Sequence, residues 1–144
     1  MTSIRLSGTN RKILMVSIAL LGLMVLGFFL SRSQSQSNLI NVQETYRKAL
    51  EDSSTVLLDV RTQTEWDDGH IDGALFIPVQ ELQDRVAELE QYKDKTIIAY
   101  CRSGNRSGVA AKILEKQGYS VLNMEGGIIR WQKEDLPLTK ESKK

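Results

Sequence analysis

The sequence predicts an α/β fold. Short runs of β-branched and apolar residues alternate with segments that carry apolar residues at helical spacing. Several of the short runs are apolar on both faces, as strands are when a parallel sheet is covered by helices on its two sides. The length of 144 residues allows one domain of ordinary size together with an appended segment.

The predicted elements fall between residues 42 and 123. Strands are predicted over 55–60, 74–77, 96–100 and 120–123. Helices are predicted over 42–50, 79–89 and 106–117. Gly118 is expected to end the last helix, because glycine readily takes the backbone conformation that closes a helix.

The N-terminal part predicts a membrane anchor. Residues 13–30 form an uncharged apolar run, and the basic segment 1–12 before it holds Arg5, Arg11 and Lys12. As a helix the run would be about 27 Å long, close to the roughly 30 Å of a bilayer core. A cleaved signal peptide is the alternative, although the run is long for one and Ser31-Arg32-Ser33 is a poor cleavage site. The basic residues place the domain on the extracytoplasmic, periplasmic side.

A folded domain is expected over 39–138, between a polar, flexible linker at 31–38 and a flexible tail at 139–144. Four of the 19 basic residues precede the domain, while all 18 acidic residues lie at or after Glu44. A mildly acidic domain lacks the basic face that nucleic-acid binding needs. We therefore expect no nucleic-acid partner.

The chain has one cysteine, Cys101, and one histidine, His70. An intrachain disulfide is impossible, and a zinc site would need several carboxylates to converge on the histidine. We predict no metal and no cofactor.

Candidate chemistry lies at the point where the apolar strand 96–100 gives way to a helix. Carboxyl ends of parallel strands are where ligands bind in open α/β sheets, and a helix N-terminus there favours an anion. Cys101 follows the strand directly, and polar and basic residues follow it: Arg102, Ser103, Gly104, Asn105, Arg106 and Ser107.

This setting predicts a lowered pKa for Cys101, through the two arginines and the helix terminus. Gly104 allows a tight turn, and Ser107 is expected to cap the helix or bond the sulfur. A lone cysteine is often a packed core residue. We favour function here, because a packing site would not be ringed by arginines and turn formers.

The chain resembles a single-domain rhodanese from near Leu39 to Leu138. The loop and its strand carry the likeness, together with motifs in the order of the family: Asp59-Val60-Arg61, Glu65-Trp66, Gly69-His70-Ile71-Asp72-Gly73-Ala74, Ile77-Pro78 and Glu125-Gly126-Gly127-Ile128 with Trp131. The resemblance implies a five-stranded parallel sheet between helices, with the cysteine at the base of a cradle of backbone amides. It also implies a sulfurtransferase that passes sulfane sulfur through a cysteine persulfide.

Phosphatases of the same fold keep five residues between the cysteine and the arginine of the loop. Here four residues separate Cys101 from Arg106. The shorter cradle should suit the terminal sulfur of a persulfide better than a phosphate, so phosphatase activity is the weaker reading.

Other residues near the loop are expected to be structural. His70 would serve architecture, because a thiolate that is already ionised needs no general base. Asp59 and Arg61 end a strand, and Arg61 is a candidate ion-pair partner of Glu65. Trp66 and Trp131 are expected in the core or at its rim. Glu134-Asp135 stands where the family often has glycine, a departure in a surface turn.

The sequence thus predicts a transferase of the thiosulfate sulfurtransferase kind. Its partners would be a small sulfur donor such as thiosulfate or polysulfide and a thiol or cyanide acceptor. The backbone of 102–107 would bind the anionic sulfur, and Arg102 would steer anionic donors. A non-catalytic binding module and a redox-sensing cysteine remain as alternatives.

Overall fold

The computed structural model describes residues 38–140. The predicted basic segment 1–12, the predicted anchor 13–30 and the linker up to residue 37 lie outside this range, as do residues 141–144. Within the described range, no helix is both long enough and apolar enough to cross a membrane.

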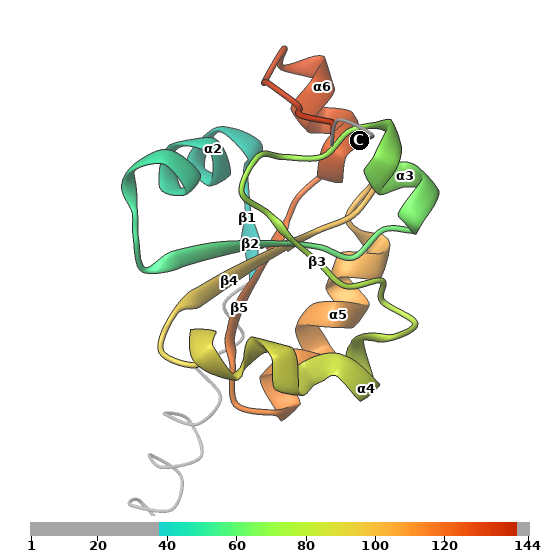
Figure 1. Ribbon diagram of the computed structural model, residues 1–144. Helices are drawn as coiled ribbons and strands as arrows, with labels where there is room; N and C mark the ends of the chain where they lie inside the picture. The colour runs from blue at the N-terminus through green and yellow to red at the C-terminus, as the bar shows by residue number, and fades with distance from the viewer. Residues whose placement is uncertain (1–37, 141–144) are drawn as a thin grey trace, which may run out of the picture. The chain divides into compact units, whose positions relative to one another are not determined.

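Five parallel strands form one sheet in the order β1-β5-β4-β2-β3 (Figure 1). The strands are β1 (Leu39–Ile40), β2 (Thr55–Asp59), β3 (Leu75–Phe76), β4 (Thr96–Tyr100) and β5 (Ser120–Met124). The parallel sheet of five strands is confirmed. The residue patterns alone predicted four, because a two-residue edge strand such as β1 is too short to show a period.

Helices cover both faces of the sheet (Figure 1). The α-helices are α2 (Val42–Glu51), α3 (Gln63–Asp68), α4 (Leu82–Arg85), α5 (Asn105–Lys116) and α6 (Gly127–Lys133), and a 3₁₀ helix spans Val86–Tyr92. One core joins α4, the 3₁₀ helix and α5 to the sheet. The other joins α2 and α6 to the opposite face.

Strand β4 lies in the middle of the sheet and supplies side chains to both cores. Ile97 and Ala99 belong to the core with α5, while Ile98 and Tyr100 belong to the core with α2 and α6. Cys101 continues this alternation and is buried on the α5 side. The strand register therefore decides which face of the sheet the cysteine meets.

The two ends of α5 differ in how well the sequence predicted them. The helix begins at Asn105 and its N-cap is Gly104, at φ 100°, so of the two roles expected for Ser107 capping is excluded and bonding to the sulfur of Cys101, at 3.4 Å, is observed. Ser107 lies in the first turn instead. The predicted stop at Gly118 is confirmed: Gly118 has φ 82°, and the N–H of Tyr119 donates to the carbonyl of Leu114 at 3.1 Å.

The helix predicted over 79–89 begins later than expected. The N–H of Val79 donates to the carbonyl of Val60 at 3.2 Å, and Val79 lies in a turn rather than in a helix. The helix starts only at Leu82 and tightens to 3₁₀ at Val86. Two short helices, α3 and α6, were not predicted, although Thr62 and Glu65 form a capping box that marks the start of α3.

The end of the domain is held in place by backbone pairing. Thr139 pairs with His70, with N···O distances of 2.8 and 2.9 Å, although the flexible tail was expected to begin at 139. Asp135 has φ 53°, in the left-handed region that favours glycine. This backbone conformation accounts for the glycine that the resembling family often carries in the turn.

Candidate active site

Cys101 lies at the carboxyl end of the central strand, where the chain turns into the loop that leads to α5. The side chain is only 1% exposed. Strands β2 and β3 lie on one side of β4, and β5 lies on its other side. The site therefore lies where the chain changes direction across the sheet. Such switch points are where open α/β sheets bind ligands.

Hydrogen-bond donors surround the Cys101 sulfur. The N–H of Gly104 lies 3.1 Å from Sγ, and the hydroxyl of Ser107 lies 3.4 Å from it. Burial by itself raises the pKa of the Cys101 thiol, but the hydroxyl of Ser107 and the N–H groups of Ser107, Ser103 and Gly104 outweigh it, so the pKa is lowered. The predicted direction of the shift is therefore confirmed.

The causes of that shift agree with one half of the prediction: N–H groups at the start of α5 lower the pKa, as expected of a helix terminus, whereas the arginines are not among its main causes. Arg106 forms a bidentate ion pair with Glu65, with both N···O distances at 2.7 Å. Hydrogen bonding to Glu65 contributes most to raising the pKa of Arg106, and the negative charge of Cys101 raises it further. The pKa of Glu65 falls to about 2, mainly through the hydrogen bond from Arg106. Much of the charge of Arg106 is thus compensated within the protein.

The start of α6 holds the loop from behind. The N–H of Ile128 donates to the carbonyl of Cys101 at 2.9 Å, and that of Ile129 to the carbonyl of Arg102 at 3.1 Å. Because C=O and N–H of one trans peptide point in opposite directions, fixing the carbonyl of Arg102 outward turns the N–H of Ser103 inward. A Cβ at Gly127 would overlap the carbonyls of Cys101 and Arg102, so glycine is required there.

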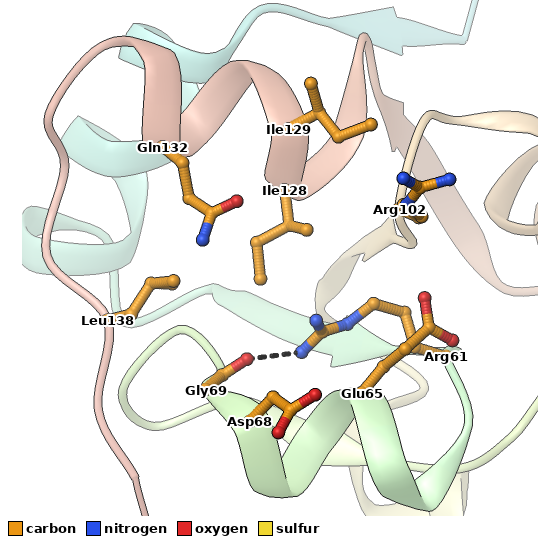
Figure 2. A pocket seen from close by; sticks show the side chains of 9 residues that line it. All are labelled: Arg61, Glu65, Asp68, Gly69, Arg102, Ile128, Ile129, Gln132 and Leu138. Carbon is orange, nitrogen blue, oxygen red and sulfur yellow. Dashed lines mark hydrogen bonds between the residues drawn. The ribbon is translucent and has the colours of Figure 1, made fainter.

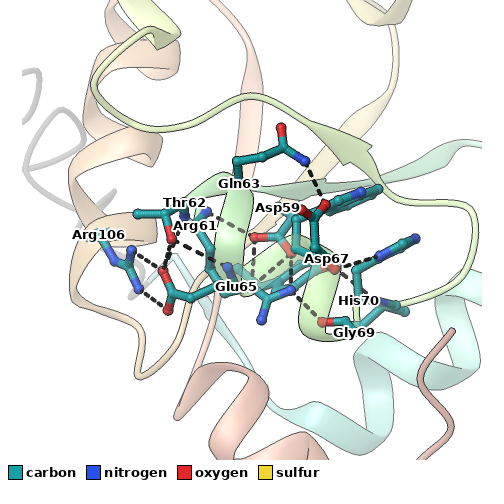
Figure 3. A network of polar contacts seen from close by, with 12 residues as sticks. Asp59, Arg61, Thr62, Gln63, Glu65, Asp67, Gly69, His70 and Arg106 are labelled. Carbon is teal, nitrogen blue, oxygen red and sulfur yellow. Dashed lines mark hydrogen bonds and ion pairs between the residues drawn. The ribbon is translucent and has the colours of Figure 1, made fainter. Parts of the chain in front are cut away.

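A buried ion pair supports the adjacent strand end (Figure 3). Arg61 donates to Asp59 from Nη2 at 2.6 Å and from Nε at 2.8 Å, and Nη2 also donates to the carbonyl of Gly69 at 2.7 Å. A structural role was expected for both residues, but their pairing with each other was not predicted. The pairing of Arg61 with Glu65 is wrong, because Thr62 caps α3 and so leaves Arg61 outside the helix.

His70 is part of the packing beneath α3. Its ring stacks on Trp66 with 3.5 Å between ring centroids, and Nδ1 lies 3.1 Å from the carbonyl of Trp66. The side chain is buried, and its backbone pairs with Thr139. These contacts agree with the architectural role expected for it. Trp66 and Trp131 are both buried, as expected.

A cavity of about 220 Å³ opens beside the loop (Figure 2). Charged groups and an apolar wall line it: Arg61, Glu65, Asp68, Gly69, Arg102, Ile128, Ile129, Gln132 and Leu138. Arg61 and Glu65 are held by their own ion-pair partners. Arg102 and Asp68 form no ion pair within residues 38–140, so they offer one positive and one negative group to a ligand. Residues 38–140 contain no cluster of three or more candidate metal ligands.

The domain that carries the site matches a known family. The family model described as Rhodanese-like domain matches residues 42–134. The chain belongs to the rhodanese-like family. A sulfurtransferase of Allochromatium vinosum is 42% identical over 97 residues, which cover 66% of this chain and 89% of that protein.

Other relatives agree with this assignment. A rhodanese-related protein from Thermoplasma volcanium superposes with a TM-score of 0.65 at 33% identity, over 71% of this chain and 97% of that one. The thiosulfate sulfurtransferase PspE of Escherichia coli is 35% identical over 71 residues, 49% of this chain and 68% of that protein. Several further relatives are longer proteins of which this chain spans less than two thirds.

The rhodanese-like domain brings part of the predicted site together. Ser103, Gly104 and Ser107 donate to the sulfur, whereas Arg106 turns to Glu65, and Asn105 begins α5. Two residues of the site were missed, Gly127 behind the loop and Asn123 beside Ser107. The signal for Asn123 was its place near the carboxyl end of β5, next to β4.

Replacing Asp59 by Asn should destabilise the rhodanese-like domain by about 3 to 5 kcal/mol, because Arg61 would keep a buried charge without its counterion. Glu65→Gln is the matched control: its ion pair with Arg106 is more than a quarter exposed and should cost about 1 kcal/mol or less. Urea unfolding of the two variants measures the difference. Equal losses would contradict the structural role of the Asp59–Arg61 pair.

Proposed function

We propose that this chain is a sulfurtransferase that carries sulfane sulfur on Cys101 as a persulfide. Membership of the rhodanese-like family, with relatives named sulfurtransferases, gives the chain a sulfurtransferase-like role in general. The observation that best supports the finer proposal is the set of N–H and O–H donors directed at the buried sulfur of Cys101.

The first half-reaction loads the cysteine. The Cys101 thiolate attacks the outer sulfur of a donor such as thiosulfate, and a new S–S bond forms. The bond between the two sulfur atoms of thiosulfate breaks, and its electron pair leaves with sulfite. A polysulfide donor would react in the same way and release a shorter polysulfide. A thiolate nucleophile is required, and the donors that lower the pKa of Cys101 favour this form.

The second half-reaction removes the outer sulfur from Cys101. A thiol or cyanide attacks the outer sulfur of the persulfide, and the electron pair of the broken S–S bond returns to Cys101 as thiolate. Backbone N–H groups of the loop stabilise anionic sulfur in both steps without moving, as preorganised donors do. Four residues between Cys101 and Arg106 keep this cradle small. A sulfur atom fits it better than a phosphate group.

We place the small-molecule partners in the cavity beside Arg102 (Figure 2). A donor such as thiosulfate carries two negative charges, and the exposed guanidinium of Arg102 attracts it. Asp68 lies on the same cavity and repels it. The two groups therefore have opposite effects on an anionic donor and little effect on a neutral acceptor thiol.

Cys101→Ser should abolish transfer of sulfur from thiosulfate to cyanide, with a loss of about a thousandfold or more, because the alcohol is a poor nucleophile at neutral pH. Mass spectrometry of the wild-type domain after thiosulfate should find one added sulfur atom on Cys101. The assignment is unambiguous because the chain has one cysteine. A Ser variant with full activity would contradict the proposal.

Mass spectrometry and activity assays also separate the alternative functions. A binding module would take up no sulfur, and a redox sensor would gain oxygen or a mixed disulfide after peroxide but no sulfur from thiosulfate. A phosphatase would hydrolyse an aryl phosphate without transferring sulfur. Each of these results would replace the sulfurtransferase assignment.

Arg102→Gln should raise the KM for thiosulfate several-fold at low ionic strength, and Asp68→Asn should lower it, because they remove opposite charges from one cavity. Asp67→Asn is the control, since Asp67 hydrogen-bonds to Gln63 and does not line the cavity. Steady-state kinetics at two salt concentrations measures the effect, which added salt should reduce. Equal shifts in all three variants would move the donor site elsewhere.

We also propose that residues 13–30 anchor the protein in a membrane with the domain on the periplasmic side. The support is the sequence: an uncharged apolar run follows Arg5, Arg11 and Lys12. A cleaved signal segment, which would release the domain into the periplasm, is the alternative.

Fractionation should find the full-length protein with membranes after a carbonate wash, because an apolar helix of this length partitions into the bilayer core. Protease added to intact spheroplasts should digest the domain. A soluble and shorter product would support cleavage instead. A domain that survives until the cells are lysed would show the opposite orientation.

A further inference from the structure

Asn123 lies one residue before the end of β5, against the loop that carries Cys101. Its Nδ2 donates to the carbonyl of Gly104 at 3.0 Å, and its Oδ1 lies 2.6 Å from the hydroxyl of Ser107. The same hydroxyl lies 3.4 Å from the Cys101 sulfur. Ser107 thus stands between the sulfur and the amide of Asn123.

Hydrogen bonding fixes the orientation of the Asn123 amide. A carbonyl oxygen only accepts, so the Nδ2 group must face the carbonyl of Gly104. The oxygen Oδ1 must then face Ser107, whose hydroxyl has to donate to it. The carbonyl of Gly104 also accepts from the N–H of Gly108 at 3.0 Å. Both lone pairs of that carbonyl are therefore used, although the hydroxyl of Ser107 lies 3.2 Å away.

Ser107 has one hydroxyl hydrogen and two acceptors that compete for it, Oδ1 of Asn123 and the sulfur of Cys101. While Cys101 is a thiol, its S–H can donate to the oxygen of Ser107, and the Ser107 hydrogen goes to Asn123. Once the thiol proton has left to solvent, the sulfur is an anion and a stronger acceptor. The Ser107 hydrogen then turns from Asn123 to the sulfur.

We propose that Asn123 is a positioning residue that holds the Ser107 hydrogen while Cys101 is a thiol and releases it when Cys101 becomes a thiolate. When Cys101 ionises, the sulfur gains the hydrogen bond from Ser107, and the hydrogen bond between Ser107 and Asn123 is lost. Asn123 therefore limits how acidic Cys101 becomes. It acts through the hydroxyl and never touches the sulfur.

Other charged groups near the sulfur do not take part in this exchange. Arg106 of α5 interacts with Cys101 and is paired with Glu65 of α3. Arg102 follows Cys101 in the loop, and the Asp59–Arg61 pair lies at the end of the adjacent strand β2. None of them hydrogen-bonds to Asn123 or Ser107 within the described residues. Variants of Asn123 leave these charges in place. A shift in the titration of Cys101 in these variants therefore measures the change in hydrogen bonding of the Ser107 hydroxyl.

A second consequence rests on the proposed sulfur transfer. A thiolate of lower pKa is a weaker nucleophile but a better leaving group. Loss of Asn123 should therefore slow the attack on thiosulfate at high pH and speed the release of Cys101 from the persulfide. A general distortion of the site would slow both half-reactions.

The decisive experiment measures the rate at which iodoacetamide alkylates Cys101 as a function of pH. Asn123→Leu removes the acceptor at 2.6 Å while filling the space against water, and leaves the Ser107 hydroxyl only the more distant carbonyl of Gly104, at 3.2 Å, besides the sulfur. Asn123→Ala is the smaller substitution should leucine not fit. Both should lower the midpoint by about half to one pH unit, the worth of one hydrogen bond. Ser120→Ala, at the exposed start of the same strand, is the control and should leave the midpoint unchanged.

Ser107→Ala completes the test. It should raise the midpoint, and adding Asn123→Leu to it should then produce no further shift, because the hydroxyl that links them is gone. An unchanged or raised midpoint in both Asn123 variants would overturn the proposal. So would an equal downward shift with and without Ser107. Alkylation needs no sulfur transfer, so the result stands apart from the proposed function.

Discussion

The structure around the loop after β4 depends on one constraint: the sulfur of Cys101 is buried, and burial opposes its ionisation. Donors must therefore surround it. The register of β4 brings the cysteine to the α5 side of the sheet, and the N–H groups at the start of α5 reach the sulfur. The first turn of α6 binds the loop carbonyls from the other side. The consecutive elements β4 and α5, together with the more distant α6, thus fix the orientation of two peptide planes.

Charged side chains mainly support this arrangement from outside it. Arg106 binds Glu65 and so ties the start of α5 to α3, and Arg61 neutralises Asp59 and holds the carbonyl of Gly69. The arginines of the loop therefore differ in function although the sequence presents them alike. Arg106 is committed to a structural ion pair, whereas Arg102 faces the cavity.

Local residue patterns predicted the strand β4 with its bounds, the loop after it, and Gly118 at the end of α5. It could not predict contacts between distant segments. Glu65 and Arg106 are 41 positions apart, and the nearer Arg61 was the more obvious partner. Gly127 acts through a close approach to Cys101 that no spacing reveals. The capping box at Thr62 was a readable signal for α3, and it was overlooked.

The donors around Cys101 fall into two physical kinds. Backbone N–H groups such as that of Gly104 are fixed by the peptide planes, so they favour any anion placed before them. The hydroxyl of Ser107 is a rotor, and its hydrogen goes to whichever neighbour accepts more strongly. A site built only from fixed donors would hold the thiolate in its most stable form and weaken it as a nucleophile. A site with one movable donor can instead respond to the charge on the sulfur, which changes as the proposed cycle turns.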